Sequence, residues 1–224
     1  SGGDTGVNAS GGIATVTNEG TITGTNGPGV VFSDISGTFN NTLVNSGTII
    51  GNGGTAVQFG AGDDLLEIGA GASFTGSVQG AAGSDTIEFL SGVNSTFSNF
   101  ADFETIAIDS GATWTNSATL TNIAVTDAGS LFNSGTIVST SAKAVTLTSS
   151  GYLSNSGAIT GHVYGVYGSG GAHSVVNTGT ITGSTFYGVY LKAGGSVTNS
   201  GTASSIYGGR VGVLIKGGVG TVAN

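Results

Sequence analysis

The side chains that could perform chemistry are few in this chain of 224 residues, and they are unevenly placed along it. There is no Cys, which excludes a disulfide scaffold and any thiolate metal site. All twelve acids lie from Asp4 to Asp127, and two histidines and four cations follow them. A catalytic triad needs an acid beside its histidine, yet every acid lies well upstream of His162 and His173. We therefore expect no serine-hydrolase site, and we expect both histidines in solvent-facing turns.

Glu67 and Glu88 are the best candidates for a pair of catalytic carboxylates. Their separation is close to the repeat spacing described below, so we expect them on neighbouring turns of the fold. A glycosidase needs two carboxylates ~5–10 Å apart across a cleft, but two outward-facing strand residues would show the same spacing. A polysaccharide lyase would need acids beside a Lys or Arg base, and here the acids and cations occupy opposite ends of the sequence. We predict no catalytic residue and no enzyme.

Asp63, Asp64 and Asp85 lie in two glycine-rich segments, GAGDDLLEI and GAAGSDTIEF. These segments resemble the calcium-binding nonapeptides of β-rolls, which run in tandem every ~9 residues, whereas Asp64 and Asp85 are separated by nearly one full repeat of this chain. Carboxylates stacked on adjacent turns would repel, and a cation would relieve that repulsion. Turn-forming Asp residues are the favoured interpretation. The alternative is a weak calcium site at these three residues, and no other cofactor is expected.

Four tyrosines are the best candidates for a ligand-binding surface. Tyr164 and Tyr187 are separated by about one repeat, as are Tyr167 and Tyr190, and each pair flanks a valine. We expect Tyr167 and Tyr190 to face outward on neighbouring turns, with Tyr207 near them. Exposed tyrosine offers apolar area together with a hydroxyl, which suits a sugar or a protein. The alternative is an aromatic pair that only stabilises the sheet.

A nine-residue motif recurs along the chain and must position these side chains. It reads LFNSGTIVS from Leu131, LSNSGAITG from Leu153 and VVNTGTITG from Val175, so that its Asn returns with a constant period of about 22 residues, as in a repeat array. On neighbouring turns of a stack, these Asn side chains would bond to one another as a ladder. The Gly two residues later is expected to allow positive φ in the bend. The predicted ladder contains Asn18, Asn45, Asn133, Asn155, Asn177 and Asn199, and Asn224 is expected to continue it.

Degenerate copies of the motif fill the gap between Asn45 and Asn133, whose length equals four repeats. Each is a triplet with a large apolar residue at its centre, and the centres are Phe74, Phe97 and Trp114. We interpret these three residues as equivalents of the motif's Ile. The array therefore continues through the whole chain.

A second apolar element follows each clear copy of the motif. It reads AVTL at Val145, GVYL at Val189 and GVLI at Val213, with apolar residues two apart, which is the period of a strand. The 44 Gly argue against helix. Three short strands per repeat indicate one turn of a parallel β-solenoid, so we predict an all-β, single-stranded parallel β-helix of about ten turns of roughly 22 residues. It would be one continuous fragment, 1–224, of a longer chain, with regular turns at 1–60, degenerate acidic turns at 61–127 and regular turns at 128–224.

The segment GAGDDLLEIGAGASFTGSVQGAAGSDTIEF, with FSNFADFETIAIDSGATWT after it, resembles passenger domains of Gram-negative autotransporters, the type V secretion family. Their G-x-D-x-L/I, F-x-x-F-E-x-L/I and G-x-W-T patterns correspond to 83–87, 100–106 and 111–115. The N-S-G-T-I repeats are similar to those of adhesin-like passengers. The resemblance implies a right-handed β-helix displayed at, or released from, the cell surface. It implies membrane attachment only through a β-barrel domain outside these residues. A haemagglutinin-type passenger of two-partner secretion is the alternative family.

We predict a non-enzymatic adhesin or self-association module on the surface of a Gram-negative bacterium. Its partner would be a glycan or protein on a host or neighbouring cell, or another copy of this chain. The alternative is a passive stalk that presents a functional domain outside these residues. The net charge of −8 excludes nucleic acid as a partner. An ice-binding threonine array is excluded because Ile50, Val138 and Ala158 interrupt it.

Overall fold

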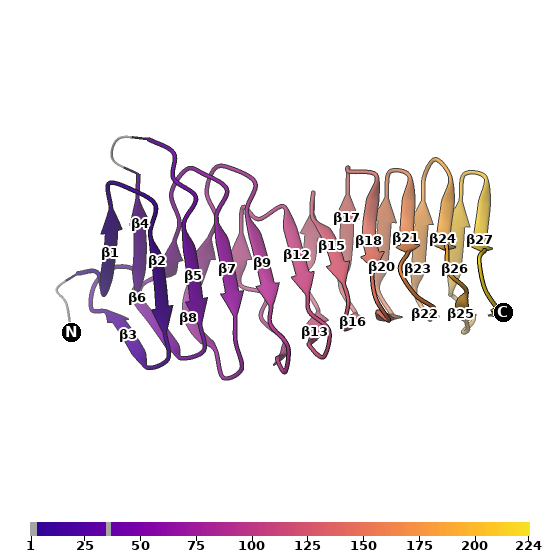
Figure 1. Cartoon of the computed structure of the whole chain (residues 1–224), viewed down its shortest axis with the longest axis horizontal. Coiled ribbons are helices and arrows are strands. Elements are labelled where there is room, and N and C mark those ends of the chain that lie inside the picture. The colour runs from indigo at the N-terminus through magenta and orange to yellow at the C-terminus, as the bar shows by residue number, and fades with distance from the viewer. Residues whose placement is uncertain (1–3, 35–36) are drawn as a thin grey trace. The chain divides into compact units, whose positions relative to one another are not determined.

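The computed structural model describes residues 4–34 and 37–224 and shows an all-β fold (Figure 1). The described residues contain no helix, and all their strand pairings are parallel. No segment among them could cross a membrane as an apolar helix. The chain divides into two compact units: residues up to Val93 with Asn99–Thr105, and Asn94–Ser98 with Ile106–Asn224. Each unit is a parallel β-solenoid, and together they contain about ten turns with a spacing near 22 residues. The predicted fold class is therefore confirmed.

The first unit is built from two sheets whose strands stack turn upon turn. The strand order in one sheet is β1-β4-β6-β8-β11, and β3 also pairs with β6. The strand order in the other sheet is β2-β5-β7-β9. The first sheet contains β1 (Val7–Ser10), β3 (Thr21–Gly24), β4 (Val30–Ser33), β6 (Thr48–Gln58), β8 (Ser73–Gln79) and β11 (Phe100–Ala101). The second contains β2 (Thr15–Asn18), β5 (Thr42–Asn45), β7 (Leu65–Ile68) and β9 (Thr86–Phe89).

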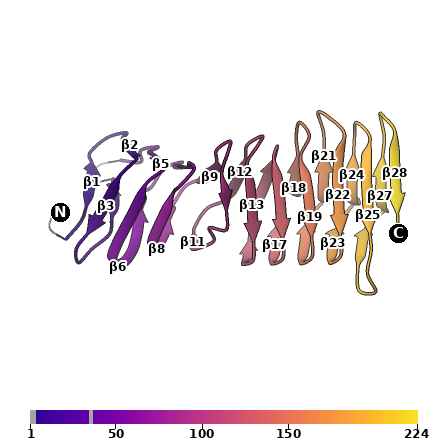
Figure 2. The same cartoon turned by 90° about the horizontal axis from the view of Figure 1, so that it is seen from below.

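The second unit has three sheets, so each regular turn contributes three short strands, as the repeat predicts (Figure 2). The first sheet contains β10 (Asn94–Ser95), β13 (Thr113–Asn116), β16 (Ser130–Asn133), β19 (Tyr152–Asn155), β22 (His173–Asn177), β25 (Gly195–Asn199) and β28 (Gly220–Ala223). The second contains β12 (Thr105–Ile108), β15 (Ala124–Asp127), β18 (Lys143–Leu147), β21 (Tyr164–Gly168), β24 (Tyr187–Leu191) and β27 (Val211–Ile215). The third contains β14 (Thr119–Thr121), β17 (Thr136–Ser139), β20 (Ala158–Gly161), β23 (Thr180–Gly183) and β26 (Ser205–Gly208).

The core of each unit is a set of apolar columns that run from turn to turn. In the second unit Leu131 pairs with Leu153, and Leu153 with Val175, and all three are fully buried. In the first unit the rings of Phe32 and Phe59 stack with centroids 5.0 Å apart. A single turn has no neighbour to cover its apolar side chains, so the stacking itself creates the core.

The register corrects our interpretation of Trp114. Phe74 does pair with Ile49, as predicted. Trp114, however, pairs with Leu131, and Leu120 takes the place opposite Ile137. The true copy of the motif is therefore NSATL, whose Asn116 pairs with Asn133 across a step shorter than the regular repeat. This copy was overlooked because it has Ala and Leu where the motif has Gly and Ile, and because the step to the next copy is shorter. Asn45 pairs next with Ile68, so the ladder position is apolar on the turn that follows in the first unit.

The glycine of the motif adopts the predicted positive φ in the copy that contains Gly201 (φ 108°), but it has a different role in other copies. Gly47, Gly135, Gly157 and Gly179 do not adopt positive φ. Instead, a Cβ at Gly157 would collide with the backbone O of Gly135 on the preceding turn, and the same holds for Gly179 over Gly157. These copies need glycine because successive bends approach one another too closely for any side chain.

Candidate functional site

The local sequence of β21 and β24 turns four tyrosines to one face of the sheet. Each strand reads Tyr-Gly-Val-Tyr, and the central Gly and Val are both buried. Tyr164 and Tyr167 consequently both point outward although they are three residues apart. A Cβ at Gly165 would lie 2.7 Å from Cγ2 of Ile181, so only glycine fits at this inward position. The break in the in–out alternation of β21 therefore follows from the close approach of Gly165 to the core.

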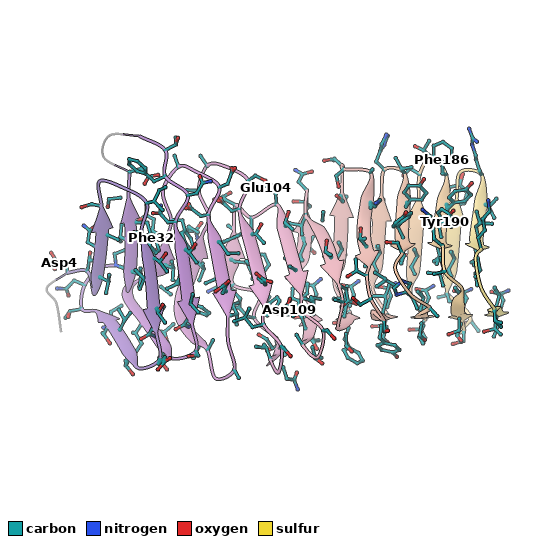
Figure 3. The ribbon with its side chains drawn as sticks, viewed as in Figure 1. Asp4, Phe32, Glu104, Asp109, Phe186 and Tyr190 are labelled. Atoms are coloured by element: carbon teal, nitrogen blue, oxygen red, sulfur yellow. The ribbon has the colours of Figure 1, made fainter. Side chains whose placement is uncertain are left out.

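The tyrosines contact one another within and between turns. Tyr164 pairs in register with Tyr187, and their ring centroids are 5.7 Å apart and nearly parallel. Tyr167 pairs with Tyr190 at 5.6 Å in an edge-to-face arrangement. Phe186 adds a fifth ring, 6.4 Å from Tyr164 and 6.0 Å from Tyr187. We call these five residues the aromatic face; Figure 3 labels two of them, Phe186 and Tyr190.

The aromatic face combines apolar surface with unused hydroxyl groups. All five side chains are partly exposed. Within the described part of the chain, no hydrogen bond involves the hydroxyl of Tyr164, Tyr167, Tyr187 or Tyr190. Their hydroxyls are therefore free to bond a ligand while the rings offer apolar area. Phe186 was missed from the sequence, where its place before the second Tyr-Gly-Val-Tyr was the available signal.

Two cations flank the aromatic face. The Nζ of Lys143 lies 4.0 Å from the ring centroid of Tyr167, and the Cζ of Arg210 lies 4.2 Å from that of Phe186. Each such contact contributes about 0.5–1 kcal/mol at an exposed site. Lys143 also pairs in register with Tyr164 on the next turn. The cations thus belong to the same surface as the rings, which the sequence analysis did not foresee.

Tyr207 does not belong to the aromatic face. It lies on β26, which pairs with β23 in a different sheet, and its register partner there is Thr182. Its side chain is 58% exposed. Its backbone O lies 2.7 Å from where a Cβ of Gly188 in β24 would be, but among the described residues its ring contacts none of the four tyrosines.

The aspartates of the glycine-rich segments form a second chain of interactions, in the first unit. Oδ1 of Asp64 accepts the backbone N–H of Asn41 at 2.6 Å, and Oδ1 of Asp85 accepts that of Asp64 at 2.7 Å. Oε2 of Glu104 then accepts the N–H of Asp85 at 2.8 Å. Asp63, which is exposed to solvent, accepts the N–H of Ser84 at 2.9 Å. These carboxyl groups therefore bind bend N–H groups that the strand pairing leaves unpaired.

Burial perturbs the two inner carboxyl groups. Asp64 is 2% exposed and Asp85 is fully buried, and neither Oδ2 has a partner. Burial is the largest cause that raises the pKa of Asp64 to about 6 and the pKa of Asp85 to about 7. Within 4–34 and 37–224, no group of three or more His, Cys, Asp or Glu is placed to hold a metal ion. Calcium binding at Asp63, Asp64 and Asp85 stays a prediction, which calorimetric titration with CaCl2 would test.

Glu67 and Glu88 are register partners on β7 and β9, as their spacing suggested. Both point away from the core, since the residues that flank them in each strand are buried. Like charges directly opposite one another on a sheet are unfavourable by themselves. The pair therefore occupies the outer face of a sheet, which agrees with the interpretation of two outward-facing strand residues.

His173 contradicts the expectation of a solvent-facing histidine. It lies on β22 and is 3% exposed, with Nε2 3.1 Å from the backbone O of Ser169 and Nδ1 without a partner. Burial lowers its pKa below the ordinary value. The sequence signal is its inward place in HSVVN, two residues before Val175. Asp127 is likewise fully buried, and burial raises its pKa to about 7. His162, in contrast, is exposed in a turn.

The asparagine ladder is present in both units. In the first, Nδ2 of Asn18 donates to Oδ1 of Asn45 at 2.8 Å. In the second, every step from Asn116 to Asn224 is bridged in the same way at 2.7–2.8 Å. The same amides also bond backbone carbonyls of the bends, as Asn155 does with Gly157 and Thr180. The ladder is structural. Its second-unit members are Asn116, Asn133, Asn155, Asn177, Asn199 and Asn224.

The fold and the aromatic face together define a parallel β-solenoid repeat protein with one exposed aromatic and cationic surface. This fold is typical of autotransporter passenger domains. Comparison of the chain with protein-family models, with curated proteins and with solved structures gives no match.

Proposed function

We propose that this chain is an adhesive segment of an autotransporter passenger, displayed at or released from the surface of a Gram-negative bacterium. The observation that carries the proposal is the aromatic face: five rings in contact across two turns, with unused hydroxyls. Surfaces that bury tyrosine against a partner are typical of binding sites. The solenoid fold and the lack of Cys support export, and the chain has no enzymatic role in this proposal.

The partner is a glycan on a host or neighbouring cell, bound across β21 and β24. Backbone groups within these strands are already paired to the neighbouring turns, so a ligand must use the side chains. Rings provide apolar contact with the faces of sugars, and free hydroxyls provide hydrogen bonds. Protein partners, another copy of this chain and a passive stalk become outcomes of the test.

The test measures binding of the labelled chain to cells, together with its sedimentation over a range of concentrations. Tyr167→Ala/Tyr190→Ala should abolish saturable cell binding, and glycosidase treatment of the cells should do the same. Tyr207→Ala is the matched control, because it removes an exposed tyrosine from another sheet, and should bind normally. Concentration-dependent dimers that survive the double substitution would favour self-association. A monomer that binds no cell would favour a stalk.

A further inference from the structure

We propose that the aromatic face takes an acidic polysaccharide, a chain of carboxylated or sulfated sugars, whose anionic groups bind Lys143 and Arg210. The inference rests on the proposed function and deepens it by naming the class of glycan. It follows from where the cations lie and from what is absent around them.

All four cations of the chain lie in, or directly beside, strands of the sheet that carries the aromatic face. Lys143 is in β18, Arg210 directly precedes β27, and Lys192 and Lys216 directly follow β24 and β27. The sequence has no acid after Asp127, and Asp127 is fully buried. Figure 1 shows β18, β21, β24 and β27 side by side as consecutive strands. Strands β18, β21, β24 and β27 and the residues beside them thus form a local cationic surface in a chain whose net charge is −8.

The two inner cations lie at opposite ends of the ring cluster along the stack. Lys143, Tyr164, Tyr187 and Val211 are successive register partners, and Arg210 immediately precedes Val211. Three turn-to-turn steps at ~4.8 Å separate the two ends, a span of ~14 Å. An extended ligand lying along this column would meet a cation, then the rings, then a second cation.

Neither cation is occupied by another charge. No ion pair involves Lys143 or Arg210 among the residues that the structure describes, and their side chains contact the rings of Tyr167 and Phe186. Arg210 is exposed and Lys143 partly so. Packing over a ring holds each charged group in place while leaving its N–H donors free. Both groups are therefore ready to donate charge-assisted hydrogen bonds to a carboxylate or sulfate.

The surface suits an acidic glycan better than nucleic acid. Nucleic-acid binding relies on many phosphate contacts, with about 6–10 in a typical site, and two inner cations cannot supply them. A sugar chain with anionic groups spaced along it needs few cations, and it uses the aromatic contacts between them.

The experiment measures the affinity of the whole chain for matched pairs of polymers at low salt. The pairs are oligogalacturonate with its carboxyl-reduced neutral form, and dextran sulfate with dextran. The acidic member should bind at least tenfold more tightly in one pair or both, and the pair that responds separates carboxylate from sulfate. Lys143→Gln and Arg210→Gln should each weaken acidic binding by about tenfold, as expected for loss of one charge-assisted contact. Lys192→Gln makes the same charge change at the far end of β24 and should alter affinity less than twofold.

Other results would contradict the inference in distinguishable ways. Equal affinity for neutral and acidic polymers, unchanged by the two substitutions, overturns it and leaves the adhesive function standing. An equal loss in Lys192→Gln overturns it in favour of net charge alone, and equally tight binding of oligothymidine overturns the choice of glycan. Binding of none of the four polymers overturns the inference, and the proposed function falls with it if the chain also binds no cells. Circular dichroism of each variant verifies that the fold is retained.

Discussion

At the scale of single residues, the stacked asparagines are the clearest link between the sequence and the stability of the fold. Asn155 accepts from Asn133 at 2.7 Å and donates to Asn177 at 2.8 Å and to Thr180 O at 3.1 Å. It is 1% exposed. A buried polar group stabilises a fold only while its partners are present, and removal of one partner leaves the others unsatisfied. The repeated Asn therefore supplies hydrogen bonds to backbone groups of the bends that water cannot reach.

Asn155→Ala should destabilise the second unit by about 2–3 kcal/mol, because it removes the hydrogen bonds to Asn133 and Asn177 and leaves the carbonyls of Gly157 and Thr180 without this donor. The single Trp of the chain, Trp114, is fully buried in this unit, with its Nε1 bonded to Phe97 O at 3.0 Å. Its fluorescence during urea unfolding therefore reports the change. Asn52→Ala, at an exposed position, is the control. Equal effects of the two substitutions would show that the ladder contributes nothing.

At the scale of the elements, the bend after each ladder Asn is set by the distance between successive turns. A Cβ at Gly47 would collide with the backbone O of Gly20, whereas a Cβ at Gly20 meets nothing within 4 Å. The same motif position therefore tolerates a side chain in one copy and forbids it in the next. The difference arises from stacking and is invisible in the motif.

Gly47→Ala should lower the free energy of unfolding of the first unit by about 1–3 kcal/mol, since backbone must move to admit the methyl group. Gly20→Ala should change it by less than about 1 kcal/mol, because the bend there is open. Urea unfolding followed by far-ultraviolet circular dichroism compares the two. Equal urea midpoints for the two variants would contradict the claim that close approach of the bends excludes a side chain at Gly47 only.

The buried carboxyl groups in the bends before β7 and β9 should make the first unit more stable at mildly acidic pH than at neutral pH. The folded pKa of Asp85, about 7, lies above its ordinary value of 3.8, mainly because of burial, with the charges of Asp64, Glu104 and Asp63 adding to it. Ionisation is therefore less favourable in the folded chain than in the unfolded one. Stability is greatest below about pH 4 for this group, and it falls as pH rises toward 7 by about 1.4 kcal/mol per pH unit.

Unfolding of the whole chain in urea at pH 5 and pH 8 measures this dependence. Asp85→Asn keeps an oxygen for the N–H of Asp64 and stays neutral, so it should flatten the pH dependence. Asp102→Asn, at an exposed position, should leave it unchanged. A first unit that is equally stable at both pH values in the unaltered chain would contradict the raised pKa.

The features that depend on the regular repeat could be predicted from the sequence. Features that depend on an irregular spacing between turns could not. The columns through Leu153 and Val166 and the outward place of Tyr167 follow from alternation within strands and from the constant repeat between turns. The shorter step from Asn116 to Asn133 breaks that repeat, so Asn116 was overlooked. The contacts of Lys143 and Arg210 with the rings depend on the exact register of β18 and β27, and no local pattern encodes it.

At the scale of the whole molecule, the two units differ in charge and in the surfaces they offer. The first holds ten acids and no Lys or Arg, and the second holds two acids and all four cations. The aromatic face belongs to the second unit, among those cations. Binding of an anionic ligand should accordingly weaken as salt rises, since screening acts on exposed charges beyond ~10 Å at 0.1 M. Affinity for oligogalacturonate measured between 20 mM and 500 mM NaCl tests this, and an affinity independent of salt would contradict it.

The measurement that tests the central claim most directly is the equilibrium binding of the purified chain to an array of immobilised glycans, compared with Tyr167→Ala/Tyr190→Ala and Tyr207→Ala. We predict saturable binding to a subset of glycans, its loss in the double variant and its retention in Tyr207→Ala. Binding that persists after both tyrosines of the aromatic face are removed would contradict the claim, as would binding to no glycan at all.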